Sequence, residues 1–278
     1  MQKTSVFKSQ EGREKIRGYY DMILNAFPLG KRYVETTFGR TFILEAGKSD
    51  RPPMVLLHGS CSNNAAWLGD LSALSREYHA FAVDIPGEPG NSEEYRLNLQ
   101  SDEYSRWLAE VLDALALKKA ILVGNSLGGW LALQFTAAHP ERVQALILLA
   151  AAGLVPPKQA FIEQTQKIPM DRSSAKATKD TILGDSVLPA EVLQFMMLVF
   201  EHFNPIIGAL PILSDVQLAG LSMPVLFIAG ISDTTMDATL AAKRLKAQVP
   251  QAEVILLEGS HVITTAADKV LPFLAGIL

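Results

Sequence analysis

The feature that most constrains this chain is a serine placed between two glycines at the junction of two apolar segments. Residues 119–123 form a short apolar run that ends at Gly124, which is typical of a buried strand. Residues 130–138 carry apolar side chains at helical spacing and stop before Pro140, where a helix is expected to end. The intervening letters, G-N-S-L-G, therefore place Ser126 on a tight turn from a strand into a helix.

This turn matches the nucleophile-elbow pattern G-x-S-x-G, in which the serine is pushed out of a strained backbone turn. Glycine two residues before and two residues after the serine avoids crowding, because it has no side chain. The helix that follows directs free backbone N–H groups and the positive end of its dipole toward the serine. A pattern this short arises by chance in roughly one chain in ten of this length, so residues elsewhere must support the interpretation.

The composition is that of a globular protein with a large core. Of the 278 residues, 49% are hydrophobic and 19% are charged, which suits one large α/β domain or two small ones. The net charge of −4 gives no electrostatic reason to expect nucleic acid or an anionic membrane as a partner. The longest apolar stretch, residues 145–155, is too short to span a bilayer.

Cysteine usage and the first residues bear on location and cofactors. The first ten residues lack the apolar core of a signal peptide, and a single cysteine, Cys61, rules out an internal disulfide. Both observations favour a cytoplasmic protein. We find no metal-ligand cluster in the sequence and expect no metal. The oligomeric state stays open.

Apolar strands alternate with helical segments along most of the chain. This alternation predicts an α/β fold with a doubly wound, mostly parallel sheet that helices cover on both faces. The expected strands are a hairpin at 33–38 and 41–45, followed by 54–57, 78–83, 119–123, 143–149, 223–230 and 252–257. The expected helices are 11–27, 64–76, 101–116, 130–138, 237–248 and one from about 262.

The alternation breaks after residue 152 and returns at residue 223. The intervening segment has several prolines, no strand pattern, and helix candidates at 157–167 and 189–202. We therefore expect residues 1–152 and 223–278 to form the core domain. Residues 153–222 are expected to form an inserted helical lid, or cap.

The second helix candidate of this cap carries an apolar cluster. We expect Phe195, Met196 and Phe200 in this cluster to line a substrate pocket, since methionine adapts well to pliable apolar pockets. The alternative is that the cluster is ordinary core.

Three reactive side chains each follow a predicted strand. They are Ser126, Asp233 and His261. Because functional residues gather past the carboxyl ends of parallel strands, we expect these three to lie close together. Asp237 competes with Asp233 as the carboxylate, but it is better placed to cap the helix at 237–248.

With these residues together, the chain resembles the α/β-hydrolase superfamily, of the small serine esterase type, over nearly its whole length. The order serine, aspartate, histidine is the order of that superfamily. The matching residues are His58-Gly59, the loop 84–92, the elbow, 224–230 through Asp233, and Gly259-Ser260-His261. One departure is the loop after Asp84, where G-E-P-G-N-S replaces the commoner short basic-glycine version.

The resemblance implies a role for each site residue and implies no cofactor. Ser126 would be the nucleophile, His261 the general base and acid, and Asp233 the partner that fixes the imidazole tautomer. The backbone N–H groups of Ser60 and Leu127 would form the oxyanion hole.

Neighbouring polar residues are expected to serve the structure rather than the reaction. We expect His58 to shape the oxyanion loop and Asp84 to stabilise its own loop. Cys61 is expected to be a small packing residue, and whether it affects the site stays open.

The sequence thus predicts a cofactor-free serine hydrolase that cleaves a carboxylic ester with an apolar part through an acyl-enzyme. A serine at the elbow argues against haloalkane dehalogenase and epoxide hydrolase chemistry, which use an aspartate there in this superfamily. Two alternatives stay open. One is hydrolysis of another acyl bond, such as a lactone, the C–C bond of a diketone, or perhydrolysis. The other is a ligand-binding receptor on the same scaffold. The particular ester, its stereochemistry and the physiological pathway are not encoded in any motif.

Overall fold

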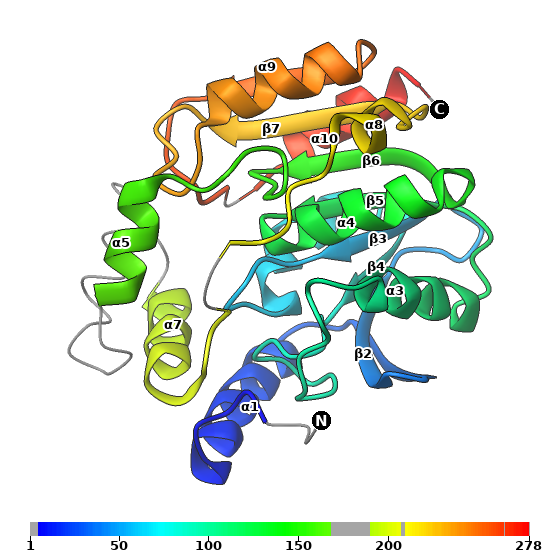
Figure 1. Ribbon diagram of the computed structural model, residues 1–278. Helices are drawn as coiled ribbons and strands as arrows, with labels where there is room; N and C mark the ends of the chain where they lie inside the picture. Colours follow the sequence, from blue (N-terminus) through cyan, green and yellow to red (C-terminus); the bar gives the residue numbers. More distant parts are fainter. Residues whose placement is uncertain (1–4, 168–189, 207–208, 264, 278) are drawn as a thin grey trace.

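An eight-stranded sheet forms the centre of the protein. The computed structural model describes residues 5–167, 190–206, 209–263 and 265–277. Within these ranges the strand order is β1-β2-β4-β3-β5-β6-β7-β8 (Figure 1). The strands are β1 (Gly30–Thr36), β2 (Gly39–Ala46), β3 (Pro53–Leu57), β4 (His79–Val83), β5 (Ala120–Asn125), β6 (Val143–Leu149), β7 (Val225–Gly230) and β8 (Glu253–Leu257). The expected hairpin is β1 and β2.

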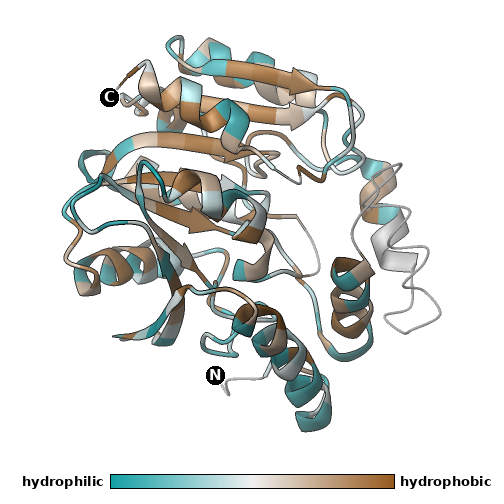
Figure 2. Cartoon of the chain, turned by 180° about the vertical axis from the view of Figure 1, so that it is seen from behind, coloured by the Kyte–Doolittle hydropathy of each residue, from teal (hydrophilic) through white to brown (hydrophobic). Residues whose placement is uncertain are grey.

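Strand β2 alone is antiparallel to both of its neighbours, and all other pairs are parallel. Every residue of β7 is buried, as are all residues of β3 except its first. Strands covered on both faces need apolar side chains on both sides, which explains their unbroken hydrophobic runs (Figure 2). The predicted mostly parallel α/β sheet is confirmed.

Helices cover both faces of the sheet. They are α1 (Gln10–Asn25), α2 (Leu68–Leu74), α3 (Glu103–Ala114), α4 (Leu127–Ala138), α5 (Gln159–Lys167), α7 (Ala190–His202), α8 (Asp215–Ala219), α9 (Ala238–Gln248) and α10 (Ala267–Ala275). One apolar core joins the sheet to α3, α4, α8 and α9. A second core, on the opposite face, joins it to α1, α2, α7 and α10.

Two helix predictions need correction. The last helix begins at Ala267 rather than near residue 262. Its start is set from a distance, because the buried Asp70 carboxylate accepts the backbone N–H groups of Ala266 and Ala267, each at 3.0 Å. A carboxylate at this position also meets the positive end of the helix dipole. The helix expected at 64–76 is a 3-10 turn, Asn64–Trp67, followed by the shorter α2.

The inserted segment contains both expected helices, as α5 and α7, while residues 168–189 lie outside the described residues. The two helices lie on the side toward which the arrowheads of β6 and β7 point (Figure 1). Helix α7 packs on α1, where the rings of Phe195 and Tyr19 stack at 6.4 Å. Further on, Leu213 and Leu218 are buried in the core beside α9. The inserted segment therefore packs on the core through α7 and through the residues around α8.

Candidate active site

Ser126 lies on a sharp turn between β5 and α4. Its backbone has φ 49° and ψ −106°, a conformation that residues with a side chain rarely adopt. Backbone hydrogen bonds impose it: the Ser126 N–H donates to the Leu149 carbonyl at 2.8 Å, and the Ser126 carbonyl accepts the Ala152 N–H at 3.2 Å. Strand β6 thus holds the turn from one side, and the serine side chain is half-buried at the carboxyl edge of the sheet.

The two glycines of the motif are required by close backbone approach. A Cβ on Gly124 would lie 2.3 Å from the Gly128 carbonyl oxygen. A Cβ on Gly128 would lie 2.1 Å from the carbonyl oxygen of Leu57 in the neighbouring strand β3. No side chain fits at such distances, so the packing of the elbow against β3 depends on both glycines.

A continuous line of hydrogen bonds joins Ser126, His261 and Asp233. The Ser126 Oγ is 3.0 Å from His261 Nε2, and His261 Nδ1 is 2.7 Å from Asp233 Oδ2. These side chains come from the ends of β5, β7 and β8, as expected from parallel strands that end at one edge. The Asp233 side chain is fully buried, while His261 stays partly exposed.

The second oxygen of Asp233 is held by its own loop. Asp233 Oδ1 accepts the Thr235 N–H at 2.7 Å, the Thr235 hydroxyl at 2.8 Å and the Met236 N–H at 3.2 Å. Burial by itself would raise the pKa of Asp233. The bonds and charge of His261, together with the bonds from Thr235, outweigh burial and lower that pKa below its ordinary value. The carboxylate is therefore kept ionised and oriented toward the imidazole.

Thr235 is a site residue that the sequence interpretation missed. Its hydroxyl lies 3.0 Å from His261 Nδ1 as well as 2.8 Å from Asp233 Oδ1. The available signal was a threonine two residues after an aspartate in a turn, because short polar side chains there form hydrogen bonds with nearby backbone groups. The pattern alone does not say that a histidine 26 residues later arrives at the same place.

Asp237, the competing carboxylate, is the N-cap of α9, and this prediction is confirmed. Its side chain accepts the Leu240 N–H at 2.9 Å, in the usual capping geometry. Asp237 therefore caps the start of α9, whereas His261 is hydrogen-bonded to Asp233.

The loop after β3 passes next to the serine. A Cβ on Gly59 would lie 3.6 Å from the Ser126 Cβ, so a side chain at this position would touch the elbow. Leu127 is the first residue of α4, a position whose N–H has no acceptor within the helix. Ser60 follows Gly59 in the same loop and is exposed.

His58 shapes this loop, as expected. Its Nδ1 lies 2.8 Å from the Gly59 carbonyl oxygen, and its Nε2 accepts the Ile85 N–H at 3.0 Å. This pair of bonds requires a neutral ring with the proton on Nδ1. Complete burial lowers the pKa of His58 to about 4, only partly opposed by the Gly59 carbonyl.

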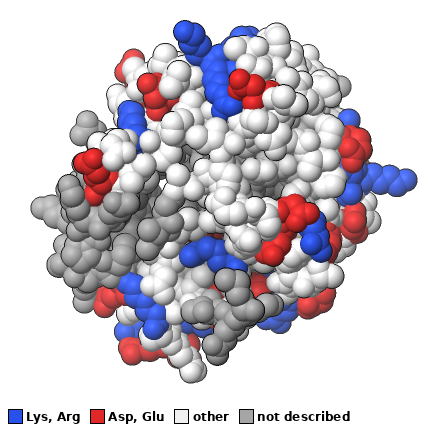
Figure 3. All heavy atoms as spheres, viewed as in Figure 1, with Lys and Arg blue, Asp and Glu red and all other residues white. Residues whose placement is uncertain are grey.

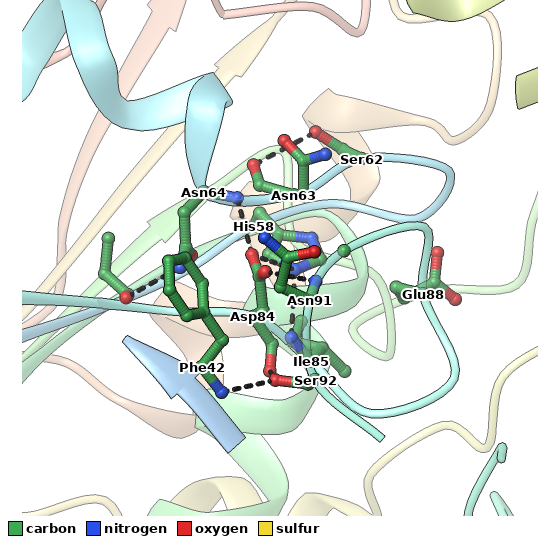
Figure 4. A network of polar contacts seen from close by, with 12 residues as sticks. Phe42, His58, Ser62, Asn63, Asn64, Asp84, Ile85, Glu88, Asn91 and Ser92 are labelled. Atoms are coloured by element: carbon green, nitrogen blue, oxygen red, sulfur yellow. Dashed lines mark hydrogen bonds and ion pairs between the residues drawn. The ribbon is translucent and has the colours of Figure 1, made fainter. Parts of the chain in front are cut away.

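Asp84 is the centre of a buried polar network beside His58 (Figure 4). Its Oδ1 accepts the Asn64 N–H at 2.8 Å and the Tyr20 hydroxyl at 3.1 Å, and its Oδ2 accepts the Asn91 N–H at 2.8 Å. Burial raises the pKa of Asp84 to about 6, although these bonds favour its ionised form. The network ties α1 and the start of the 3-10 turn to the loop 84–92.

The residues expected to line a pocket sit on α7. Phe195 and Phe200 are buried and Met196 is half-buried. The Phe195 ring stacks on Tyr19 of α1, so at least this side chain contributes to core packing. A role for the three in substrate binding stays a prediction.

The start of the inserted segment is bonded to the loop that carries Asp233, which the sequence did not indicate. The Lys158 N–H donates to the Thr235 carbonyl at 2.8 Å, and its Nζ donates to the Asp233 carbonyl at 2.5 Å. Pro157 and Met236 form an isolated antiparallel bridge. The residues before α5 are therefore bonded to the loop that holds the carboxylate.

The visible surface carries charges of both signs. On the face shown in Figure 3, acidic and basic side chains are interspersed among a majority of other residues. Over the described ranges, no group of three or more His, Cys, Asp or Glu side chains is arranged to hold a metal ion. None of the helices traced in those ranges combines the length and apolarity needed to cross a bilayer.

Comparison with known proteins extends these observations. Residues 52–178 match the model of the alpha/beta hydrolase fold family. The carboxylesterase YbfK of Bacillus subtilis is 27% identical over 99% of both chains. A pimeloyl-[acyl-carrier protein] methyl ester esterase of Aeromonas hydrophila is 30% identical over 74% of this chain and 82% of its own.

Solved structures agree on the fold. The crystal structure of the carboxylesterase CesB (YbfK) from Bacillus subtilis superposes with a TM-score of 0.89 at 24% identity, covering 96% of this chain and all of that one. Since the fold, the family match and the esterase relatives agree, the chain belongs to the α/β-hydrolase superfamily and is a serine hydrolase.

Proposed function

We propose that the protein is a cofactor-free carboxylesterase that cleaves esters with an apolar part through an acyl-enzyme. The observation that carries the proposal is the hydrogen-bonded line from Ser126 through His261 to Asp233. A nucleophile, a base and an orienting carboxylate within hydrogen-bond reach are what acyl transfer by a serine requires. Esterase names among the relatives support the same bond type.

Acylation begins when Ser126 Oγ attacks the ester carbonyl carbon and His261 Nε2 takes the hydroxyl proton. The Oγ–Nε2 distance of 3.0 Å is within the range for such a transfer. The carbonyl oxygen becomes an oxyanion, which the backbone N–H groups of Ser60 and Leu127 stabilise. The ester C–O bond then breaks, and His261 gives its proton to the leaving alcohol.

Deacylation repeats these steps with water. His261 takes a proton from the water that attacks the acyl carbon, and the acid product leaves as Ser126 recovers its proton. In both halves Asp233 stabilises the imidazolium and fixes its orientation. The three donors on Asp233 Oδ1 support this role, because they leave Oδ2 aimed at the imidazole.

The inserted segment 153–222 is the proposed cap that sets substrate size. Its support is the position of α5 and α7 beyond the carboxyl edge of the sheet and the anchor of Lys158 on the Asp233 loop (Figure 1). Phe195, Met196 and Phe200 are its proposed apolar lining.

The direct test is hydrolysis of p-nitrophenyl esters of increasing acyl length by the wild-type protein and Ser126→Ala. A lactone and a diketone are included to separate ester cleavage from the other acyl reactions. We expect ester hydrolysis by the wild type and, in the variant, at most the residual rate of about 10³–10⁴ over water that a triad-free site supplies. An organophosphonate should add one mass increment, at the peptide that contains Ser126. Wild-type turnover in a folded Ser126→Ala protein would refute the proposal.

A further inference from the structure

A buried glutamate lies behind the loop that follows β3. Glu88 belongs to the G-E-P-G stretch of the loop 84–92, and its side chain is completely buried. Its Oε2 accepts the Cys61 N–H at 2.6 Å. Its Oε1 has no hydrogen-bond partner among the described residues and lies 3.9 Å from Arg96 Nη2. None of the catalytic steps above uses this carboxyl group.

A buried carboxylate is an unfavourable choice if only packing is needed. Removing a charge from water has a cost that an incomplete set of partners does not offset. Burial raises the pKa of Glu88 to about 7, while Arg96, the Cys61 N–H and the Ser60 hydroxyl act in the opposite direction. An apolar side chain of the same length would avoid this cost, so the carboxylate is expected to hold something in place.

What it holds is a strained turn. Cys61 has φ 56°, in the left-handed region that residues with a side chain seldom occupy. Such a conformation persists only where the surroundings impose it, and strain of this kind is concentrated at functional sites. The short, charge-assisted bond from the Cys61 N–H to Glu88 supplies that constraint.

The constraint acts on the proposed oxyanion donor. The Cys61 N–H lies in the same rigid peptide plane as the Ser60 carbonyl, so fixing it restricts the rotation of Ser60. We propose that Glu88 is a positioning residue for the oxyanion hole, whose carboxylate holds the Ser60–Cys61 turn so that the Ser60 N–H faces the oxyanion. This inference rests on the proposed ester hydrolysis and deepens it.

Arg96 holds the loop that carries Glu88. Its guanidinium donates to the carbonyl of Gly87, beside Glu88, at 3.1 Å and to that of Asn204 at 2.8 Å. The Asn204 contact lies just beyond α7, so the loop that carries Glu88 is tied to the proposed cap at the end of α7. Arg96 thereby links the cap, the glutamate and the oxyanion loop.

The test compares Glu88→Met, Glu88→Gln and a control, Glu93→Leu. Methionine has an unbranched side chain about as long as that of glutamate but lacks the carboxylate acceptor for the Cys61 N–H, whereas the glutamine amide oxygen can accept that bond. Glu93 is a half-buried glutamate five residues further along, which accepts the Glu94 N–H at 3.0 Å. For each protein we measure kcat and KM for a p-nitrophenyl ester, folding by circular dichroism, and inhibition by an aryl trifluoromethyl ketone.

The ketone reports on the oxyanion hole directly. Ser126 Oγ adds to its carbonyl carbon, the proton passes to His261, and the C=O electron pair becomes the oxyanion of a hemiketal. We expect Glu88→Met to lower kcat and ketone affinity by the same factor, about 10- to 100-fold, below the 10²–10³ that complete loss of one donor costs. KM should change little, Glu88→Gln should stay close to wild type, and Glu93→Leu should match it.

A folded Glu88→Met protein with wild-type kcat and ketone affinity, or with a change in KM alone, would overturn the inference. If Glu88→Met does not fold, Arg96→Met replaces it, and the same paired loss of kcat and ketone affinity is expected. A crystal structure of the variant gives a readout that does not depend on turnover: Cys61 should leave the left-handed region. A Cys61 backbone that stays at positive φ would also refute the inference. Absence of ester hydrolysis by the wild-type protein would instead count against the proposed function.

Discussion

The buried His58 makes the stability of this protein depend on pH in a way that can be isolated. Its pKa is lowered from 6.5 to about 4, because the ring is completely buried and the bond to the Gly59 carbonyl only partly opposes that effect. As pH falls below 6.5 the unfolded chain takes up a proton on this histidine, whereas the folded chain does not. The stability that this difference in pKa contributes is therefore complete above pH 6.5 and is lost as pH falls toward 4.

The size of this contribution to stability follows from the fall of the His58 pKa from 6.5 to about 4. At about 1.4 kcal/mol per unit, and with half of the folded protein protonated at pH 4, His58 should remove about 3 kcal/mol of unfolding free energy between pH 7.5 and 4. Asp84 and Glu88 act oppositely, since their raised pKa values of about 6 and about 7 remove stability as pH rises. The dependence of the wild-type unfolding free energy on pH therefore combines contributions of both signs.

The variant His58→Asn separates the histidine contribution from those of the carboxyl groups. His58→Asn keeps a donor near the Gly59 carbonyl but leaves the Ile85 N–H without an acceptor, which should cost about 1–3 kcal/mol at pH 7.5. In the difference between wild type and variant, the terms of carboxyl groups that the substitution leaves unchanged cancel. Asp84 Oδ1 lies 4.0 Å from His58 Nε2, so Asp84→Asn in both backgrounds removes its term. We expect that difference, measured by urea unfolding, to decrease by about 3 kcal/mol between pH 7.5 and 4.

The control is Thr41→Val, which leaves the buried Trp107 indole N–H without its acceptor at 2.8 Å. This change should cost a similar amount, about 1–3 kcal/mol, at every pH, because it removes no titratable group. A His58→Asn difference as independent of pH as that of the control would refute a buried neutral histidine.

Three further results are expected. Asp233→Asn should lower kcat for ester hydrolysis by up to about 10⁴, because the imidazole loses its orienting partner. Asp237→Asn should keep its activity and lose at most about 1 kcal/mol of unfolding free energy, because it removes only a helix cap. If ester assays and urea unfolding gave the opposite result for the two variants, Asp237 would be the catalytic acid. Thr235→Val should lower kcat more than it changes KM, because Asp233 Oδ1 loses a hydroxyl donor while its bonds from backbone N–H groups remain; an unchanged kcat would show that the hydroxyl is dispensable. Met196→Ala and Phe200→Ala should shift the preferred acyl length in the p-nitrophenyl ester series, and identical chain-length profiles would count against the cap as a specificity element.

Much of the fold was predictable because its signals are local. Most parallel strands are short apolar runs that stop at a glycine or a polar residue, although β6 continues into three alanines, and α1 and α3 show helical periodicity. The elbow is encoded within five residues, since the close approach of Gly124 to Gly128 occurs inside the turn itself. The order of Ser126, Asp233 and His261 along the chain was also visible. Parallel strands alone then bring their carboxyl ends to one edge.

Other features could not be predicted from the sequence, because the residues that form the deciding contacts are far apart in the chain. The last helix starts at Ala267 because Asp70, nearly 200 residues earlier, accepts its first N–H groups. No periodicity near residue 262 contains that information. The positions of α5 and α7 likewise depend on contacts with the acid loop and with α1.

The sequence by itself determined the α/β class, the serine elbow and the identity of three side chains suited to acyl transfer, because propensity, glycine placement and strand order act over short distances. Only the tertiary structure decided how these groups are supported. It gave Asp233 its Thr235 partner, made His58 a neutral buried ring, and set Glu88 against the Cys61 N–H. Burial and charge pairing arise from residues that meet only when the chain has folded, so the electrostatics of the site belongs to the fold rather than to any motif.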